Sequence, residues 1–267
     1  MPGALGLLTD FGLRDGYVGM MKAVALGIAP DARIVDISHD IAPQDIEMGS
    51  WTLGIAWRYF PAGSVLVCVV DPGVGGERRA ITLAAGGRYF VGPDNGLFTH
   101  VLAQAPAERC VELTNTAYHL PGASATFHGR DIFAPCGAHL LAGVTLDTLG
   151  APVDPETLAR LPIPLAPSWE GETLVGRVAH VDHFGNLISD IPLAEPSTLS
   201  ASGVRIEVGG CVIARYATHF AAGPVDELFA LRDSSRALAI AVRDGSAAAA
   251  LGVGRGAVVR VRGLPYP

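Results

Sequence analysis

Lysine is almost missing from this sequence: Lys22 is the only one among 19 basic residues, and the rest are arginines. A single lysine leaves one candidate for Schiff-base chemistry, and Lys22 lies inside a predicted helix. The sequence also lacks a GxxxxGK motif, which excludes a P-loop phosphate site. The basic residues are dispersed and the formal net charge is −7. We expect no nucleic-acid partner, because phosphate contacts require clustered arginine or lysine.

Long hydrophobic runs are absent as well. The densest apolar run, residues 65–70, is far shorter than the roughly 20 residues of a membrane-spanning helix, so we expect no membrane partner. No basic segment precedes the first apolar stretch, which argues against a secretory signal peptide. The cysteines form no CxxC pair and are interpreted as core thiols; they are Cys68, Cys110, Cys136 and Cys211. We therefore expect a cytoplasmic protein.

Strands and helices alternate over the first 151 residues. Short apolar runs predict strands, at residues 5–9, 33–38, 65–70, 80–85, 88–91 and 110–113. Helical patterns predict helices, at residues 15–29, 45–59, 97–104 and 130–142. Asp15 is the expected cap of the first helix. The alternation predicts an α/β domain over residues 1–151, with a mostly parallel sheet.

The amino-acid composition changes after this domain. Prolines crowd residues 152–168, where they disfavour both helix and central strand, and predict an interdomain linker. Short β-rich runs follow over residues 169–267, with one helical stretch at 246–251. Gly209-Gly210 joins two of the runs as a tight turn. These features predict a second domain that is an antiparallel, barrel-like β structure.

The segment Asp71-Pro72-Gly73-Val74-Gly75-Gly76-Glu77-Arg78-Arg79 carries the first candidate site. A buried strand delivers Asp71 at its carboxyl end, where open α/β sheets bind ligands. The proline and glycines let the backbone turn sharply and approach a ligand closely, and Arg78 follows within reach. A surface turn with an ion pair is the alternative interpretation.

Three further segments carry polar side chains at turns. His128 precedes Gly129 at a predicted helix start, which favours polar or anionic ligands, although a capping turn is an alternative. Asp10 follows the first strand, where a carboxylate can accept hydrogen bonds from a ribose diol or form an ordinary Asx turn. Asp182 and Asn186 flank an aromatic residue and a glycine in the second domain. The histidines show no metal-ligand spacing, so we assign no metal.

Five segments occur in a fixed order along nearly the whole chain. They are Leu8-Thr9-Asp10-Phe11-Gly12, Asp71-Pro72-Gly73-Val74-Gly75, Gly92-Pro93-Asp94-Asn95-Gly96, Phe127-His128-Gly129-Arg130-Asp131 and Phe184-Gly185-Asn186. With this order and this domain plan, the sequence resembles the S-adenosyl-L-methionine (SAM) hydrolases, or hydroxide adenosyltransferases, which are relatives of the bacterial fluorinase and chlorinase. The resemblance implies a homotrimer with active sites at subunit interfaces. It implies no cofactor, because SAM is the substrate.

The resemblance also implies roles for individual residues. The implied catalytic set is Asp71, Arg78 and His128. The implied substrate contacts are Asp10 to the ribose hydroxyls, Asp182 to the methionine amino group, Asn186 to the nucleoside, and Ser234 and Ser235 to the methionine carboxylate. The segment around the two serines matches the family more loosely. Fluorinases carry uncharged residues around the position of Asp71, so this sequence resembles the hydrolases more.

The implied reaction is in-line attack of water on ribose C5′, with methionine leaving as a neutral thioether. Asp71 or His128 can take the proton as attack develops, and the sequence leaves that choice open. Arg78 cannot be deprotonated, so its role is electrostatic. One alternative is a halide adenosyltransferase, against which the Asp71 carboxylate argues because it repels halide. Another is a non-catalytic protein that binds SAM or adenosine.

Overall fold

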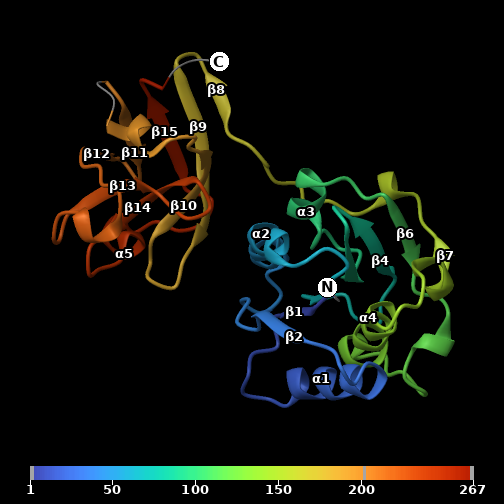
Figure 1. The fold of residues 1–267 in the computed structure, drawn as a ribbon. Helices are drawn as coiled ribbons and strands as arrows, with labels where there is room; N and C mark the ends of the chain where they lie inside the picture. Colours follow the sequence, from blue (N-terminus) through green and yellow to red (C-terminus); the bar gives the residue numbers. More distant parts are fainter. Residues whose placement is uncertain (1–2, 201–202, 265–267) are drawn as a thin grey trace. The chain divides into compact units, whose positions relative to one another are not determined.

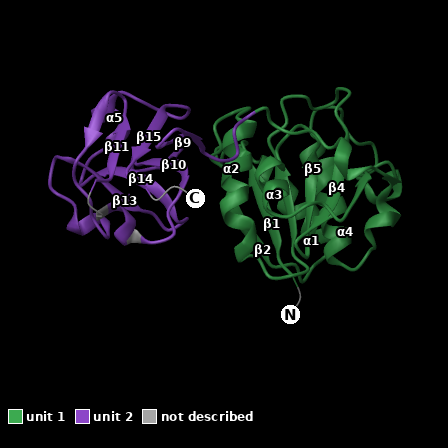
Figure 2. Ribbon diagram, turned by 90° about the horizontal axis from the view of Figure 1, so that it is seen from above, with its two compact units in different colours: residues 1–162 green, residues 163–267 purple. Residues whose placement is uncertain are grey.

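The computed structural model describes residues 3–200 and 203–264. The chain divides into two compact units, Met1–Pro162 and Ile163–Pro267 (Figure 2). The first is an α/β unit and the second an antiparallel β unit, so the predicted fold class is confirmed. None of the helices in the described residues is long and apolar enough to cross a membrane.

A seven-stranded sheet forms the centre of unit 1, as far as that unit is described, in the order β2-β1-β3-β5-β4-β6-β7 (Figure 1). Its strands are β1 (Leu5–Thr9), β2 (Ile34–Ser38), β3 (Val65–Val69), β4 (Ala80–Ala85), β5 (Arg88–Pro93), β6 (Arg109–Glu112) and β7 (Ala151–Pro152). Neighbours among β2, β1, β3 and β5 are parallel, whereas β4, β6 and β7 join through antiparallel pairs. The sheet is mixed, and its parallel half brings the ends of β1 and β3 side by side.

Helices cover both faces of this sheet. They are α1 (Tyr17–Ile28), α2 (Ile46–Ala56), α3 (Thr99–Gln104) and α4 (Ala134–Leu141). Side chains alternate along a strand. Val65, Val67 and Val69 of β3 therefore pack with residues of α1 and α4, while Leu66 and Cys68 pack with residues of α2 and α3. Burial on both faces explains why β1 and β3 are continuous apolar runs.

The caps of the first two helices differ. Asp45 caps α2, because its carboxylate accepts the N–H of Met48 at 2.9 Å. The predicted cap of α1 by Asp15 is wrong: Gly16 holds the cap position, and no side chain there bonds the helix. Asp15 lies one residue too early to reach the free N–H groups of the first turn.

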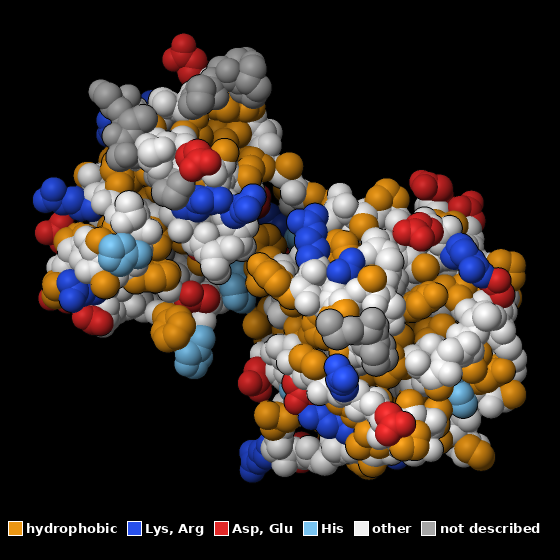
Figure 3. Space-filling view, in the orientation of Figure 1, with side chains coloured by type: hydrophobic (Ala, Val, Ile, Leu, Met, Phe, Trp, Pro, Cys, Tyr) orange, Lys and Arg blue, Asp and Glu red, His pale blue; other side chains and the backbone are white. Residues whose placement is uncertain are grey.

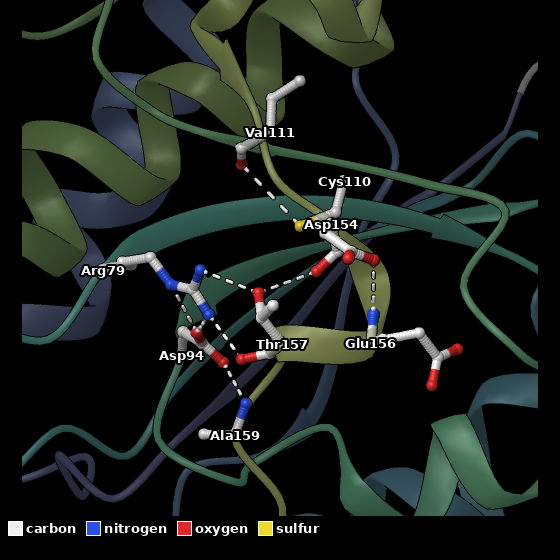
Figure 4. A network of polar contacts seen from close by, with 8 residues as sticks. All are labelled: Arg79, Asp94, Cys110, Val111, Asp154, Glu156, Thr157 and Ala159. Carbon is white, nitrogen blue, oxygen red and sulfur yellow. Dashed lines mark hydrogen bonds and ion pairs between the residues drawn. The ribbon is translucent and has the colours of Figure 1, made fainter.

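The first half of the proline-rich stretch belongs to unit 1. Arg79 donates from Nε to Asp94 at 2.8 Å and from Nη2 to the carbonyl of Thr157 at 2.7 Å (Figure 4). The second oxygen of Asp94 accepts the N–H of Ala159 at 2.8 Å. These contacts hold the chain against the sheet up to the boundary at Pro162.

Unit 2 is a curved antiparallel sheet around a core of its own. Its strands are β8 (Ser168–Glu170), β9 (Thr173–Val181), β10 (Leu187–Pro192), β11 (Arg205–Val208), β12 (Cys211–Ile213), β13 (Leu228–Arg232), β14 (Ala237–Val242) and β15 (Val258–Arg262). The order is β12-β11-β15-β9-β10-β14-β13, with β8 beside β9. A bridge between Tyr216 and Ala230 brings the two ends of this order together, which nearly closes a barrel. Ser246 caps the short helix α5 (Ala247–Leu251).

Candidate active site

A cavity of about 420 Å³ opens in unit 1 beyond the carboxyl end of β3. Its wall includes residues from three loops: Phe11, Tyr17, Val69, Asp71, Val74, Ser124, Thr126, Phe127, His128, Gly129 and Arg130. Two of the three predicted catalytic residues, Asp71 and His128, therefore line one cavity. This edge of a parallel sheet is where α/β folds bind ligands.

Asp71 and Arg78 form a buried ion pair beside this cavity. The side chain of Asp71 is 4% exposed and that of Arg78 is 11% exposed. Arg78 donates from Nε to Oδ1 at 3.0 Å and from Nη2 to Oδ2 at 2.5 Å, which is the two-point pairing that a guanidinium makes with a carboxylate. Asn95 donates to the carbonyl of Val70 at 2.8 Å and so fixes the strand end that carries Asp71.

The same guanidinium contacts His128. Arg78 Nη2 lies 2.7 Å from Nδ1 of His128. A guanidinium only donates hydrogen bonds, so Nδ1 accepts and the ring proton of a neutral His128 resides on Nε2. Burial, followed by the charge of Arg78, lowers the pKa of His128 below its ordinary value, which favours this neutral form. Buried Phe133 packs against both side chains, with the Arg78 guanidinium carbon 5.4 Å from the centre of its ring.

Glycine at position 75 allows two loops of the site to meet. Gly75 has φ +76°, a backbone conformation that residues other than glycine rarely adopt. A Cβ atom placed there would lie 2.3 Å from the carbonyl oxygen of Ala125. The loop that carries Asp71 and Arg78 thus packs directly against the loop that leads to His128. The predicted sharp turn applies at Gly75, and the close approach observed there is to the backbone of Ala125, whereas the predicted approach to a ligand stays a prediction.

His128 precedes a π-helical turn rather than the start of a regular α-helix. The turn spans Gly129–Phe133, and the N–H of Ala134 reaches back five residues to the carbonyl of Gly129. Asp131 in this turn is 2% exposed and accepts the N–H of Ser124 at 2.8 Å. Arg130 also pairs with Asp131, and its guanidinium lies 5.0 Å from the ring centre of Phe127. The turn therefore positions His128 and the cavity wall together.

Asp10 lies next to the cavity wall. It directly precedes Phe11, and its Oδ2 accepts the backbone N–H of Gln44 at 2.8 Å. Because β1 and β3 are paired in parallel with Thr9 opposite Val69, Asp10 and Asp71 follow neighbouring strand ends. Within the described residues, no hydrogen bond to the other oxygen, Oδ1, accompanies this contact.

Sequence reasoning missed the aromatic side of the cavity. Phe11, Tyr17 and Phe127 pack edge to face, with ring centres 5.2 to 6.0 Å apart. Tyr17 is 45% exposed. Aromatic rings with an exposed edge offer a stacking surface for a flat, apolar ligand group. The available signal was that Phe11 and Phe127 directly adjoin Asp10 and His128.

The predicted site residues of unit 2 lie in two of its turns. Asp182 accepts the backbone N–H groups of Phe184 and Asn186, each at 2.9 Å, and the side-chain amide of Asn186 at 2.8 Å. Asn186 is buried, so these contacts order the turn itself. Ser234 and Ser235 lie exposed between β13 and β14, and Ser235 donates to Asp233 at 2.8 Å.

The described residues hold no cluster of metal ligands, and the buried thiols of unit 1 are poorly reactive. Residues 3–200 and 203–264 contain no group of three or more His, Cys, Asp or Glu side chains arranged to hold a metal. Burial raises the pKa of Cys110 and Cys136 to about 12, so neither is a ready nucleophile. Cys68 is completely buried, and burial raises its pKa as well.

Comparison with known proteins identifies the family. The sequence pattern of the SAM hydroxide adenosyltransferase N-terminal domain matches residues 5–150, and that of the C-terminal domain matches residues 176–260. This chain belongs to the SAM hydroxide adenosyltransferase family. The first match contains Asp10, Asp71, Arg78 and His128, and the second contains Asp182 and Asn186.

Several named proteins and one solved structure are similar to this chain. The (R)-S-adenosyl-L-methionine hydrolase of Salinispora tropica is 43% identical over 89% of each chain. The enzyme of the same name from Thermus thermophilus is 45% identical over 76% of this chain and 78% of its own. A fluorinase from an Actinoplanes species is 28% identical over 70% of this chain and 71% of its own. The crystal structure of an uncharacterized conserved protein from Thermotoga maritima shares the fold with a TM-score of 0.90, at 37% identity over 97% of this chain and 99% of its own.

Proposed function

We propose that this protein hydrolyses S-adenosyl-L-methionine by attack of water on ribose C5′, giving adenosine and L-methionine. The observation that carries the proposal is the contact of one guanidinium with both Asp71 and His128 at a shared cavity. Relatives at 40 to 45% identity are named (R)-S-adenosyl-L-methionine hydrolases. The sulfonium makes methionine a good leaving group, so the protein's task is to position and deprotonate water.

Asp71 is our candidate for the proton acceptor. Its Oδ1 accepts one N–H of Arg78, whereas Oδ2 accepts two. A carboxylate oxygen has two acceptor positions, so Oδ1 retains one for a water molecule. A carboxylate that accepts a proton while attack develops contributes typically 10² to 10⁴-fold to the rate. Arg78 holds this carboxylate in one orientation and supplies positive charge beside the oxygen that is losing a proton.

His128 is our candidate for the group that orients the water. While Arg78 occupies Nδ1, a neutral His128 offers an N–H at Nε2 and no free lone pair. Such a ring donates a hydrogen bond to the oxygen of water and leaves the opposite lone pair to face carbon. Fixing water and C5′ at the correct distance removes part of the entropic cost of the reaction.

We further propose that the (R)-sulfonium form of SAM is a substrate, as the names of the relatives indicate for those proteins. The two forms differ in the side of sulfur that carries the methyl group. A site that fixes both the nucleoside and the methionine leaves room for the methyl group on one side only. We propose nucleoside contacts from Asp10 and Asn186, and methionine contacts from Asp182, Ser234 and Ser235.

We also propose a cytoplasmic homotrimer. Its support is the family resemblance together with apolar surface beside the cavity, where Leu13 is 68% exposed and Tyr17 is 45% exposed. Exposed apolar side chains next to a cavity suit coverage by a second copy of the chain. Light scattering at several protein concentrations would give three times 27.7 kDa if this is correct.

The decisive experiment incubates purified protein with each sulfonium form of SAM in ¹⁸O-labelled water. Label in the 5′-hydroxyl of adenosine is the expected result and establishes attack of water at C5′. Unchanged SAM after long incubation would favour a binding protein. Parallel reactions with chloride or fluoride would yield a 5′-halogenated nucleoside if the protein were a halide adenosyltransferase.

A further inference from the structure

Two loops at the end of β1 are joined by three contacts outside the Asp71, Arg78 and His128 set. The first loop comprises residues 9–12, starts at the last residue of β1 and carries Asp10. The second loop comprises residues 39–45 and connects β2 to α2. Thr9 Oγ1 lies 2.8 Å from His39 Nδ1, and the N–H of Gly12 donates to the carbonyl of His39 at 2.8 Å. The N–H of Gln44 donates to the carboxylate of Asp10 at 2.8 Å. The second loop thus contacts the first on both sides of Asp10.

His39 is the centre of a chain of polar contacts that runs from the surface to the cavity wall. Lys22 donates to Asp36 at 2.7 Å, and the other oxygen of Asp36 lies 3.1 Å from Nε2 of His39. Burial alone would raise the pKa of Asp36, but hydrogen bonds from Lys22 and His39 lower it below its usual value. The carboxylate is therefore ionised. Nε2 of His39 lies within ion-pair distance of it without forming a hydrogen bond of good geometry, and we assign the ring proton to Nε2 on that distance.

The direction of the remaining contacts follows from this proton. In a neutral ring Nδ1 is then an acceptor, so the hydroxyl of Thr9 donates to it. The Thr9 oxygen accepts in turn from the N–H of Phe11 at 3.2 Å. Thr9 is completely buried and the His39 side chain is 2% exposed, so water does not substitute for these partners. The chain of donors and acceptors fixes the backbone on both sides of Asp10.

Gln44 shows that this arrangement is costly to the local backbone. Gln44 has φ +67°, which is unfavourable for a residue with a side chain. The Gln44 side chain is exposed, so burial does not account for the conformation. What the conformation provides is an N–H directed at Asp10. Backbone strain of this kind persists where surrounding structure enforces it, commonly at functional sites.

We propose that His39 and Gln44 are positioning residues for the Asp10 carboxylate, and that through it they set affinity for the nucleoside part of the substrate. This inference rests on the proposed function and adds to it two residues from a separate loop. Gln44 occupies one oxygen of Asp10 and leaves the other for a diol. His39, through Thr9, holds the backbone from which the carboxylate projects. Neither residue touches the reacting atoms.

The test is a double-mutant cycle between His39 and Asp10, read out as adenosine binding by calorimetry. His39→Gln should weaken adenosine binding about tenfold, the equivalent of one lost hydrogen bond in a buried network. In an Asp10→Ala background the same change should have no further effect, because the residue through which it acts is gone. His139→Gln is the matched control, since that half-buried histidine of unit 1 packs on Tyr118.

Each outcome of this cycle has a distinct meaning. A His39→Gln loss of equal size in both backgrounds would show a general structural effect and overturn the inference. Unaltered protein that releases adenosine from SAM while the cycle is additive would overturn this inference and leave the proposed function intact. Unaltered protein that binds adenosine with a non-additive cycle but never hydrolyses SAM would overturn the proposed function alone. Absence of adenosine binding to the unaltered protein, together with SAM that stays unchanged, would overturn both.

Gln44 provides an independent measurement on the same carboxylate. Gln44→Gly keeps the N–H and suits the positive φ, so adenosine affinity should remain within about twofold and stability should rise slightly. Gln44→Val disfavours that φ and should turn the N–H away, raising the KM for SAM about fivefold or more while kcat changes less. Equal KM values for the two variants would contradict the positioning role of Gln44.

Discussion

The guanidinium of Arg78 lies 2.7 Å from Nδ1 of His128, and this contact decides which nitrogen of the ring carries a proton. A ring held in this way offers an N–H to the cavity rather than a lone pair. For the proposed hydrolysis this leaves Asp71 as the candidate proton acceptor, and Asp71 contacts the same Nη2 nitrogen of Arg78 through its Oδ2. The contact between Arg78 and His128 thus distinguishes the role proposed for His128, donor to water, from the role proposed for Asp71, proton acceptor. The sequence alone does not separate these roles.

Two substitutions of His128 distinguish a donor from a base. His128→Gln places an amide N–H near the position of Nε2, whereas His128→Asn is too short to do so. If His128 orients water, we expect His128→Asn to lower kcat by about 10² to 10³-fold, as the loss of one preorganised donor does. His128→Gln should retain distinctly more activity. Equally severe losses in both variants, measured as initial rates of adenosine release, would instead indicate that His128 takes the proton.

Asp71→Asn tests the proton acceptor with almost no change of shape. The amide cannot take a proton at neutral pH, so kcat should fall by about 10² to 10⁴-fold. Adenosine affinity, measured by calorimetry, should change little because Asp71 is not proposed to hold the nucleoside. A matched loss of affinity and turnover would show that Asp71 binds substrate instead.

The Asp71 and Arg78 pair should also contribute to stability. Arg78→Met leaves a carboxylate that is 4% exposed without its partner, which should lower the free energy of unfolding by about 3 kcal/mol. The double variant with Asp71→Asn should recover part of that loss, since no buried charge then remains unpaired. Urea unfolding of the two single variants and the double variant measures both effects. Additive losses would show that the pairing is energetically unimportant.

The pH dependence of the rate follows from His128. Burial and the neighbouring Arg78 lower its pKa below the ordinary 6.5, so the ring is neutral at and above that pH. Activity should be constant there and fall as pH decreases through the lowered pKa, where protonation of Nδ1 breaks the contact with Arg78. The associated stability is likewise complete above 6.5 and lost on acidification. A kcat/KM profile with its acidic midpoint above 6.5 would contradict this.

Gly75→Ala should disturb the contact between the loop that carries Asp71 and Arg78 and the loop that leads to His128. The added methyl would lie 2.3 Å from the carbonyl of Ala125, in addition to the unfavourable positive φ. We expect a loss of about 2 to 3 kcal/mol in stability and a clear fall in kcat. Gly122→Ala is the control, because Gly122 has φ +71° but open space around it, and should cost only about 1 kcal/mol. Similar kcat values for both variants would refute the argument.

Much of the architecture could be predicted from local pattern. The strands β1 and β3 are continuous apolar runs because they are buried on both faces, and such runs are readily recognised. The strand β10 is not evident from the sequence, because Ser189 and Asp190 interrupt its apolar pattern. Ser189 is nonetheless 1% exposed, and its hydroxyl donates to the carbonyl of Leu238 at 2.8 Å. That contact comes from a strand distant in sequence, which no local pattern contains.

The candidate site also combines features that the local sequence predicts with features that depend on contacts between distant segments. Asp71 and His128 were predicted from their positions at a strand end and a helix start, and the structure places both at one cavity. The bridging position of Arg78 and the tautomer of His128 depend on the fold of a glycine-rich loop against a second loop. The contact of His39 with Thr9 is not evident from the sequence either, because these two residues become neighbours only when β1 and β2 pair.

The wide turn at Gly129–Phe133 has a consequence for how such a site can change. In an α-helix each residue is rotated by about 100° from the one before it. A π-helical turn contains one extra residue, so the residues that precede it are rotated about the helix axis relative to their positions in a regular α-helix. The imidazole that precedes the turn is thus out of step with α4, whose inner face packs into the core. The direction of the imidazole is consequently set by the turn and by the core residue Phe133 that packs on it, rather than by the regular spacing of α4.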